Sequence, residues 1–298
     1  MTRIGFDVRD CACATVASAM TASAAMIVLI PVEYRALKGI DSHAHVFSRD
    51  APSVPGARYR PDYAATLERW QSFWPAAGIT HGVLVQPSFF GTDNRELLDA
   101  LARQPEKLRG VAVVAPSIDE GEIARLHALG VRAVRLNLHG VNDFSPYRAA
   151  AWKRLLDRIA ARGWHLEAFV NPGRAPDLLA ALDETAIALV LDHFGNPGTT
   201  FEGVATFAAA SRRARDREVW CKLSAPYRLA AHDPKTLAAR WLDTLGPDRL
   251  VWGSDWPFTN HEAEAGYAWL RAALGGWLDE RSVARVLWDN AARLYDLS

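Results

Sequence analysis

The sequence predicts an α/β protein: a single (β/α)8 TIM barrel over residues 38–298, preceded by a short N-terminal extension over residues 1–37. Runs rich in Val, Ile and Leu alternate with amphipathic helical patterns, and eight such runs recur at a spacing of roughly 30 residues. Continuous apolar strands that alternate with helices form a parallel sheet covered on its outer face. Eight repeats close most naturally into a barrel.

The expected strands follow one another in order along the chain. They are GIDSHAHV (39–46), THGVLVQ (80–86), LRGVAVVA (108–115), VRAVRLNL (131–138), WHLEAFV (164–170), IALVLDHF (187–194), EVWCKLS (218–224) and RLVWGSD (249–255). Between them lie helical patterns such as 62–78, 94–107 and 150–163, each of which ends near Gly or Pro. A doubly wound open sheet is the alternative. It would normally carry a glycine-rich loop after the first strand, and DSHAHVFSRD contains no glycine.

The composition describes a folded protein with a large core and no global charge. Of the 298 residues, 50% are hydrophobic and 11 are Trp, while 34 basic residues balance 34 acidic ones. A net charge of zero gives no general attraction to nucleic acid or to an anionic membrane, so neither is expected as a partner. The three cysteines, Cys11, Cys13 and Cys221, are too few for a disulfide framework, which favours a reducing compartment and a cytoplasmic location.

Residues 1–37 are treated apart from the barrel because their composition differs from the rest of the chain. Small and apolar residues dominate this segment, which admits a secretory signal or a membrane anchor. Asp7 and Asp10 dilute the basic start of a signal, and recurring Ser and Thr weaken an anchor. We therefore expect a poorly ordered or loosely docked extension, and the sequence leaves open whether it belongs to the working protein.

Polar side chains mark the carboxyl ends of the expected strands, where barrel enzymes build their active sites. His43 and His45 end the first strand, His193 follows the sixth and Asp255 ends the eighth. Other polar residues at strand ends are Gln86, Ser88, Asn137, Lys222 and Ser224. Residues two apart on a strand point to the same side, so His43 and His45 should project together into the mouth of the barrel.

These four residues have the chemistry of a hydrolytic centre. A carboxylate at Asp255 can take a proton from water while the imidazoles of His43, His45 and His193 polarise a carbonyl. The same side chains are also ordinary ligands of Zn²⁺ or Mn²⁺, so the residues alone leave the metal question open.

The ordered motifs of the chain resemble those of the amidohydrolase superfamily, and within it 2-pyrone-4,6-dicarboxylate lactonase and related lactonases. The resemblance runs from about Gly39 to Tyr295 and rests on IDSHAHVF, GTDN, IDEGEIARLHALGVRAVRLN, LDHFGNP, VWGSDWP and DNAARLY. It implies a (β/α)8 barrel that hydrolyses a small anionic lactone during breakdown of aromatic compounds. In that group the residues matching His43, His45, His193 and Asp255 form the hydrolytic centre. The aspartate activates water, and the histidines polarise the carbonyl.

The resemblance also bears on metal. Metal-dependent members usually add a histidine at the end of strand five, or a carboxylated lysine on strand four, and neither is present here. We therefore expect no metal ligand and no cofactor, with Zn²⁺ or Mn²⁺ as the alternative.

By the same resemblance, Tyr59, Ser88, Arg135 and Arg228 would meet the substrate's carboxylates. Two departures stand out. The lactonase has a second arginine beyond strand four, where this chain offers only His139 and Val141, and a tyrosine on strand five, where it has Phe169. These losses point away from the dicarboxylated pyrone and toward a substrate such as a muconolactone or sulfomuconolactone.

Two further functions stay open at this point. One is a metal-dependent decarboxylase or hydratase that acts on a small aromatic-derived acid. The other is a barrel that binds a small molecule without catalysis. The sequence fixes neither the lactone ring nor the oligomeric state.

Overall fold

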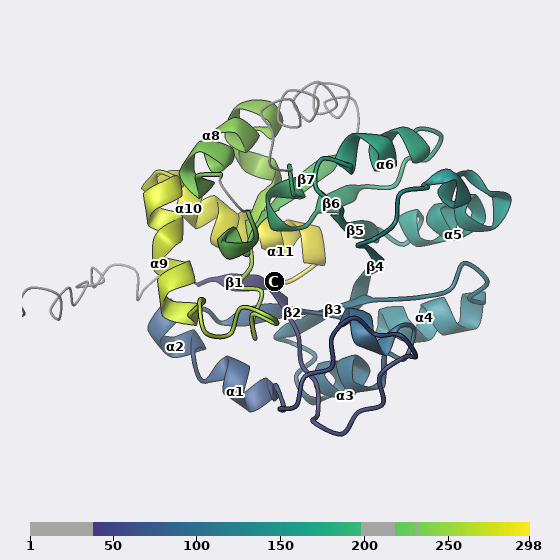
Figure 1. The fold of residues 1–298 in the computed structure, drawn as a ribbon, viewed down its shortest axis with the longest axis horizontal. Helices are drawn as coiled ribbons and strands as arrows, with labels where there is room; N and C mark the ends of the chain where they lie inside the picture. Colours follow the sequence, from purple (N-terminus) through teal and green to yellow (C-terminus); the bar gives the residue numbers. More distant parts are fainter. Residues whose placement is uncertain (1–37, 198–217, 230–231) are drawn as a thin grey trace, which may run out of the picture. The chain divides into compact units, whose positions relative to one another are not determined.

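The computed structural model describes residues 38–197, 218–229 and 232–298. Within them, eight parallel strands pair in chain order from β1 to β8, and helices lie around the outside (Figure 1). The strands are β1 (Ile40–Ala44), β2 (His81–Val85), β3 (Leu108–Ala112), β4 (Val131–Leu138), β5 (His165–Val170), β6 (Leu189–Leu191), β7 (Val219–Leu223) and β8 (Leu250–Trp252). The predicted (β/α)8 barrel and all eight predicted strands are confirmed. The prediction for residues 1–37 lies outside the described residues.

The ring closes through the segment that follows β8. Ala44 forms a parallel bridge with Trp256, and the His45 amide donates to the Trp256 carbonyl over 2.8 Å. The Asp255 amide donates to the His43 carbonyl over 2.8 Å in the same region. Closure therefore places two of the expected catalytic segments side by side.

The helices of the described residues are short. Their bounds are α1 (Leu67–Gln71), α2 (Trp74–Ala77), α3 (Arg95–Arg103), α4 (Glu120–Ala128), α5 (Ala150–Ala160), α6 (Ala175–Ala181), α8 (Pro234–Leu245), α9 (Tyr267–Trp277), α10 (Glu280–Ala284) and α11 (Asn290–Tyr295). Of these, α1, α4, α8 and α10 begin at Thr or Asp side chains that accept from the first-turn amides. The helical pattern over 62–78 forms two helices instead of one. Pro75 has no amide hydrogen to continue α1, and it lies in the first turn of α2, where that hydrogen is not needed. In the described part of the chain, no helix has the length and apolarity needed to cross a membrane.

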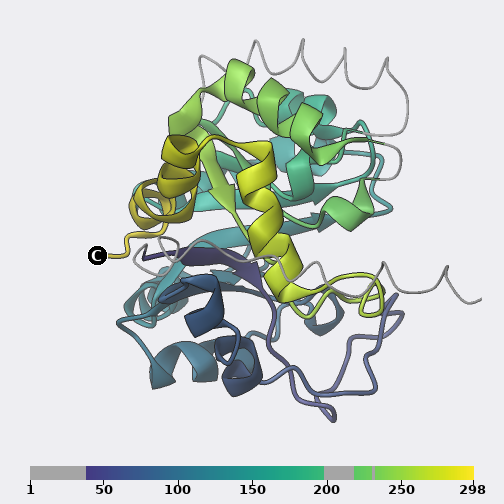
Figure 2. The same ribbon diagram turned by 90° about the vertical axis from the view of Figure 1, so that its left-hand side faces the viewer.

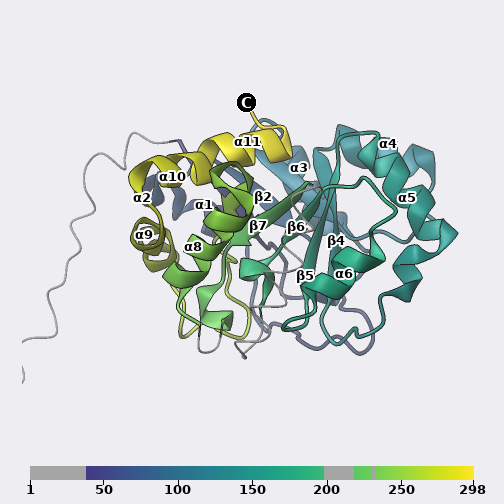
Figure 3. The same cartoon turned by 90° about the horizontal axis from the view of Figure 1, so that it is seen from above.

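The inside of the barrel is apolar at one end and polar at the other. Its apolar end is filled by the following buried residues: Ile40, Val83, Val85, Val111, Ala133, Val190, Trp220 and Val251 from the strands, and Ala291, Tyr295 and Leu297 from the C-terminal segment. Figures 2 and 3 show α11 and the C-terminus at this end, opposite the long loops that follow β1 and β8. The floor is therefore closed, and the mouth lies at the carboxyl ends of the strands.

Candidate active site

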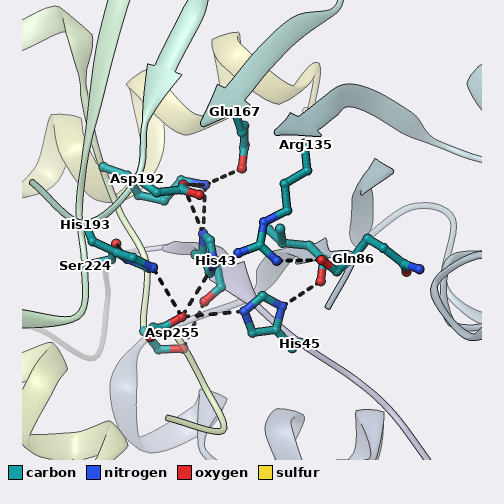
Figure 4. Close-up of polar contacts among 12 residues, drawn as sticks. His43, His45, Gln86, Arg135, Glu167, Asp192, His193, Ser224 and Asp255 are labelled. Atoms are coloured by element: carbon teal, nitrogen blue, oxygen red, sulfur yellow. Dashed lines mark hydrogen bonds and ion pairs between the residues drawn. The ribbon is translucent and has the colours of Figure 1, made fainter. Parts of the chain in front are cut away.

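The four side chains expected to form a hydrolytic centre converge at the mouth (Figure 4). The Nε2 atoms of His43, His45 and His193 lie 3.5, 3.6 and 3.8 Å from a single oxygen, Oδ1 of Asp255. All four residues are buried. Three imidazole nitrogens around one carboxylate oxygen form a small polar centre in which a water or a carbonyl oxygen can be bound.

Local backbone features fix these positions. His193 and Asp255 both have positive φ angles, 52° and 60°, a region that side chains other than Gly rarely adopt. Such conformations are strained and persist only where the surrounding structure holds them in place. They are frequent at functional sites. Gly253 allows the β8 segment to approach β1, since a Cβ atom there would lie 2.5 Å from the His43 Cβ. The sequence around Asp255 is thus adapted to bring that carboxylate against the β1 histidines.

The second oxygen of Asp255 is held by two donors from the segment after β7. The Tyr227 hydroxyl donates to Oδ2 over 2.7 Å, and the Arg228 Nε donates to it over 3.0 Å. Burial raises the pKa of Asp255, but the Arg228 guanidinium and the surrounding donors outweigh it, and the pKa lies well below its usual range. Burial also keeps Tyr227 protonated by raising its pKa. Asp255 is therefore a fixed carboxylate with Oδ1 directed at the histidines.

A hydrogen bond on the far side of the ring fixes which nitrogen of His45 carries the proton, and a second one is compatible with the opposite tautomer in His193. The Nδ1 of His45 lies 2.7 Å from the Val85 carbonyl, which can only accept, so Nδ1 carries hydrogen and the Nε2 of neutral His45 has a free lone pair. The Nδ1 of His193 lies 2.8 Å from the Ser224 hydroxyl, which can donate to it and leave Nε2–H toward Asp255. The histidines are therefore not chemically equivalent.

A buried lysine lies beneath His43. The Lys222 ammonium is 2.6 Å from Glu167 Oε2, 3.2 Å from Asp192 Oδ1 and 3.1 Å from His43 Nδ1. Because an ammonium only donates, this contact favours the tautomer of His43 with hydrogen on Nε2. The Asp192 carboxylate, at 3.4 Å from the same Nδ1, is the more distant partner. Tyr295 from the barrel floor donates to Glu167 and completes the cluster.

The electrostatic environment keeps two of the histidines neutral. Burial, followed by the Lys222 ammonium, lowers the pKa of His43 to about 4. Burial lowers the pKa of His193 to about 3. Burial raises the pKa values of Glu167 and Asp192, but Lys222 outweighs it and both carboxylates stay ionised. At neutral pH the imidazoles of His43 and His193 are therefore neutral and lie between fixed charges.

Sequence reasoning noted Lys222 at a strand end without giving it a role, and it missed Glu167, Asp192 and Tyr227. Glu167 and Lys222 each interrupt an apolar strand, in HLEAFV and VWCKL. A charged residue inside a strand buried on both faces is the signal that could have identified them.

Asp41 was also missed. It accepts hydrogen bonds from the Ser254 amide, the Ser254 hydroxyl, the Trp70 indole and the Tyr267 hydroxyl, and so anchors the segment next to Asp255.

A pocket opens above this centre, with about 50 Å³ of space for water-sized molecules. All four predicted substrate residues line it: Tyr59, Ser88, Arg135 and Arg228. Arg135 is buried and donates to the Gln86 carbonyl over 2.6 Å. Arg228, expected to meet substrate, contacts Asp255 with Nε and the Thr259 carbonyl with Nη2. Tyr59 donates to Glu262, so its hydroxyl already has a protein partner.

The donor set also fits a divalent metal in type and spacing. Ligand atoms of His43, His193 and Asp255 lie within 4.8 Å of one another, and the buried His43 Nε2 has no hydrogen-bond partner among the described residues. These residues, together with His45, would hold a Zn²⁺ or Mn²⁺ ion, which would ionise water and polarise a carbonyl.

The fixed charges are already balanced without such an ion. The carboxylates of Asp255, Asp192 and Glu167 face the cations of Lys222, Arg228 and Arg135, which gives three charges of each sign. A divalent cation would add two positive charges to this buried set. The charge balance therefore favours proton transfer by the chain's own residues.

Comparison with known proteins shows the family of this chain. The amidohydrolase family profile matches residues 40–297. The chain belongs to the amidohydrolase family. It is 34% identical over 239 residues to the 2-pyrone-4,6-dicarboxylate hydrolase of Comamonas testosteroni, covering 74% of this chain and 77% of that protein. It is 31% identical over 255 residues to the 4-sulfomuconolactone hydrolase of Rhizobium radiobacter, covering 78% and 80%.

A solved relative has the same fold. The crystal structure of a probable 2-pyrone-4,6-dicarboxylic acid hydrolase from Acinetobacter baumannii, with citric acid bound, has a TM-score of 0.78 and 33% identity, covering 87% of this chain and 99% of that chain. The resemblance predicted from the motifs is confirmed, and this amidohydrolase is a hydrolase. The relatives favour neither the non-catalytic binding barrel nor the metal-dependent decarboxylase or hydratase.

Proposed function

We propose that this amidohydrolase opens a small carboxylated lactone by direct attack of water. The observation that carries the proposal is the convergence of three imidazole nitrogens on Asp255 Oδ1 at the base of an arginine-lined pocket. Relatives named as hydrolases of 2-pyrone-4,6-dicarboxylate and of 4-sulfomuconolactone support the same class of substrate. Hydrolysis of such a lactone would belong to the breakdown of aromatic compounds.

Asp255 is the proposed general base. Its Oδ2 is held by Tyr227 and Arg228, so Oδ1 accepts a proton from a water molecule placed among the histidines. The water oxygen then forms a bond to the lactone carbonyl carbon. With its Nδ1 hydrogen donated to the Val85 carbonyl, His45 can offer the Nε2 lone pair as a second proton acceptor, 3.6 Å from Oδ1.

His43 and His193 are the proposed oxyanion donors. As the water attacks, the carbonyl π electrons move to oxygen, and Nε2–H groups directed at that oxygen stabilise its negative charge. The oxyanion then re-forms the carbonyl, and the bond between the acyl carbon and the ring oxygen breaks. The ring oxygen leaves with the proton returned by Asp255 or His45, which restores the base and yields an opened carboxylic acid.

The substrate's acid groups would be bound by arginine, because the planar guanidinium forms two parallel hydrogen bonds with one carboxylate. Arg135 is the strongest candidate, since it is buried, lines the pocket and has an Nε without a hydrogen-bond partner among the described residues. Ser88 and Tyr59 also line the pocket and remain predicted substrate contacts.

The test is a hydrolysis screen of carboxylated five- and six-membered lactones, including 2-pyrone-4,6-dicarboxylate and muconolactones. We expect turnover of at least one, and loss of about two orders of magnitude or more in kcat for Asp255→Asn, the range for removal of a general base. The matched control is Asp157→Asn on the exposed face of α5, which should keep full activity. Failure of every lactone, or full activity in Asp255→Asn with an unchanged circular dichroism spectrum, would overturn the proposal.

A further inference from the structure

An arginine that sequence reasoning did not single out also faces the pocket. Arg58 belongs to the segment between β1 and α1, and its side chain lines the pocket together with Arg135 and Arg228. The Nη1 of Arg58 lies 3.0 Å from the Nε2 of His139, the residue that follows β4. Arg58 is exposed at the mouth, whereas Arg135 is buried deeper.

Neither Arg58 nor Arg135 is in direct contact with a carboxylate, although the charges of Asp192, Asp255 and Glu167 act on Arg135 from a greater distance. Among residues 38–197, 218–229 and 232–298, no acidic side chain lies within 4.0 Å of either guanidinium. Arg228 differs, because it pairs with Asp255. Partial shielding from water lowers the pKa of Arg58, and the positive charges of Arg228 and Arg135 lower it further. Two guanidinium groups that contact no carboxylate directly and repel each other across one pocket are stabilised by a ligand that brings negative charge to both.

His139 holds Arg58 in this position. Because an arginine only donates, His139 Nε2 must accept, which places the ring hydrogen on Nδ1. The His139 ring lies nearly parallel to Phe169, with centroids 6.2 Å apart and an interplanar angle of 6°. Phe169 in turn packs against the catalytic His193 with centroids 5.2 Å apart. The Arg58 guanidinium is therefore held by His139, and the His139 ring is held by Phe169, which also contacts His193.

We propose that Arg58 is a second anion-binding residue and that the substrate is a lactone with two anionic groups, one bound by Arg135 at depth and one by Arg58 at the mouth. The proposal deepens the proposed function, on which it rests, because it names the substrate class of the same pocket. It also changes the expectation drawn from the motifs. The guanidinium missing after β4 is replaced by one from the segment after β1, so the dicarboxylated ring is favoured again.

The first experiment measures binding without turnover. The probes are benzene-1,3-dicarboxylate, a planar ring with two carboxylates, and benzoate, with one, each titrated by calorimetry into the full chain. We expect Arg58→Gln to weaken binding of the dicarboxylate by roughly tenfold, the effect of one charge-assisted contact. The affinity for benzoate should not change. The matched control is Arg60→Gln, because Arg60 lies two residues away but lines a different pocket. It should change neither affinity.

The second experiment measures hydrolysis of lactones with one and two acid groups. We expect Arg58→Gln to raise KM for the doubly charged lactone by a similar factor while kcat stays nearly constant. His139→Phe, which keeps an aromatic ring beside Phe169 but removes the acceptor, should produce a smaller change in the same direction. Equal effects of Arg58→Gln on both ligand classes, or no effect on either, would overturn the proposal. If no lactone is hydrolysed, the proposed function fails while the calorimetry still decides the role of Arg58.

Discussion

Lys222→Met removes the positive charge from the centre of the buried cluster while keeping a long apolar side chain. Glu167 and Asp192 then lose an ammonium at 2.6 and 3.2 Å, and all three residues are fully or almost fully buried. Loss of one partner from a buried ion pair costs about 3–5 kcal/mol, because the remaining charge is left uncompensated. For a domain of this size about 1 kcal/mol lowers the melting temperature by about 2–4 °C, so we expect a fall of about 6–20 °C.

The pH dependence of this loss gives a second signature. In the wild type, Lys222 holds the pKa of Glu167 below its usual range, so its contribution to stability is present above about pH 4.5 and is lost as pH falls further. In Lys222→Met, burial without the ammonium raises the pKa values of Glu167 and Asp192 instead. Folding of the variant then takes up protons. The stability difference from wild type should be largest at neutral pH and should shrink as pH falls toward about 4.5.

The assay is thermal and urea unfolding followed by circular dichroism between pH 4.5 and 8. Two companion variants distinguish the loss of the buried ion pair from a general destabilisation of the fold. Lys153→Met removes a partly exposed lysine paired with Glu184 on the surface and should leave the melting temperature nearly unchanged. Glu167→Gln added to Lys222→Met removes one uncompensated charge and should recover part of the loss. A melting temperature for Lys222→Met equal to that of Lys153→Met at neutral pH would refute the reasoning.

Three further predictions concern Asp255, His193 and Gly253. Tyr227→Phe removes one hydrogen bond to Asp255 and should lower kcat by roughly two- to tenfold, measured with the preferred lactone. His193→Gln should flatten the decline of unfolding free energy between pH 6 and 4 by roughly 1.4 kcal/mol per pH unit, because wild-type unfolding takes up a proton there. Gly253→Ala places a Cβ 2.5 Å from the His43 Cβ and should reduce activity and cost about 1–3 kcal/mol, in urea unfolding.

Each of these predictions has a result that contradicts it. Unchanged kcat in Tyr227→Phe would mean that the hydroxyl does not hold Asp255 in its active position. The same pH slope in His193→Gln and wild type would show that His193 is not buried in its neutral form. Gly276→Ala, where the new Cβ meets open space, is the control for Gly253→Ala. Equal behaviour of the two alanine variants would contradict the close approach of the β8 segment to His43.

Sequence patterns predicted the barrel because the strands are local features with strong periodicity. All eight strands overlap the predicted runs, and the residues expected at strand ends lie at one mouth because parallel strands end at the same face. The convergence of His43, His45, His193 and Asp255 follows from the same rule. The division of the predicted helix over 62–78 was missed because amphipathic spacing continues across Pro75.

The polar support of the site was not predictable in the same way, because it depends on contacts between distant segments. The contact of Lys222 with Glu167 and His43 joins three strands across the inside of the barrel, and no local pattern specifies which interior side chains meet. Arg58 comes from a segment without helical or strand periodicity. Its position in the pocket depends on the contact with His139, which is distant in the sequence and could not be predicted from it. The hydrogen bond from Tyr227 to Asp255 likewise depends on how two loops close together.

The central claim is that Asp255 and the three histidines hydrolyse a lactone without the help of a metal. The most direct test is kcat/KM for the preferred lactone on protein treated with a chelator, with elemental analysis of the same sample. We predict full turnover per chain at metal contents far below one ion per chain, with no gain on adding Zn²⁺ or Mn²⁺. Loss of activity on chelation, restored in proportion to added metal, would contradict the claim.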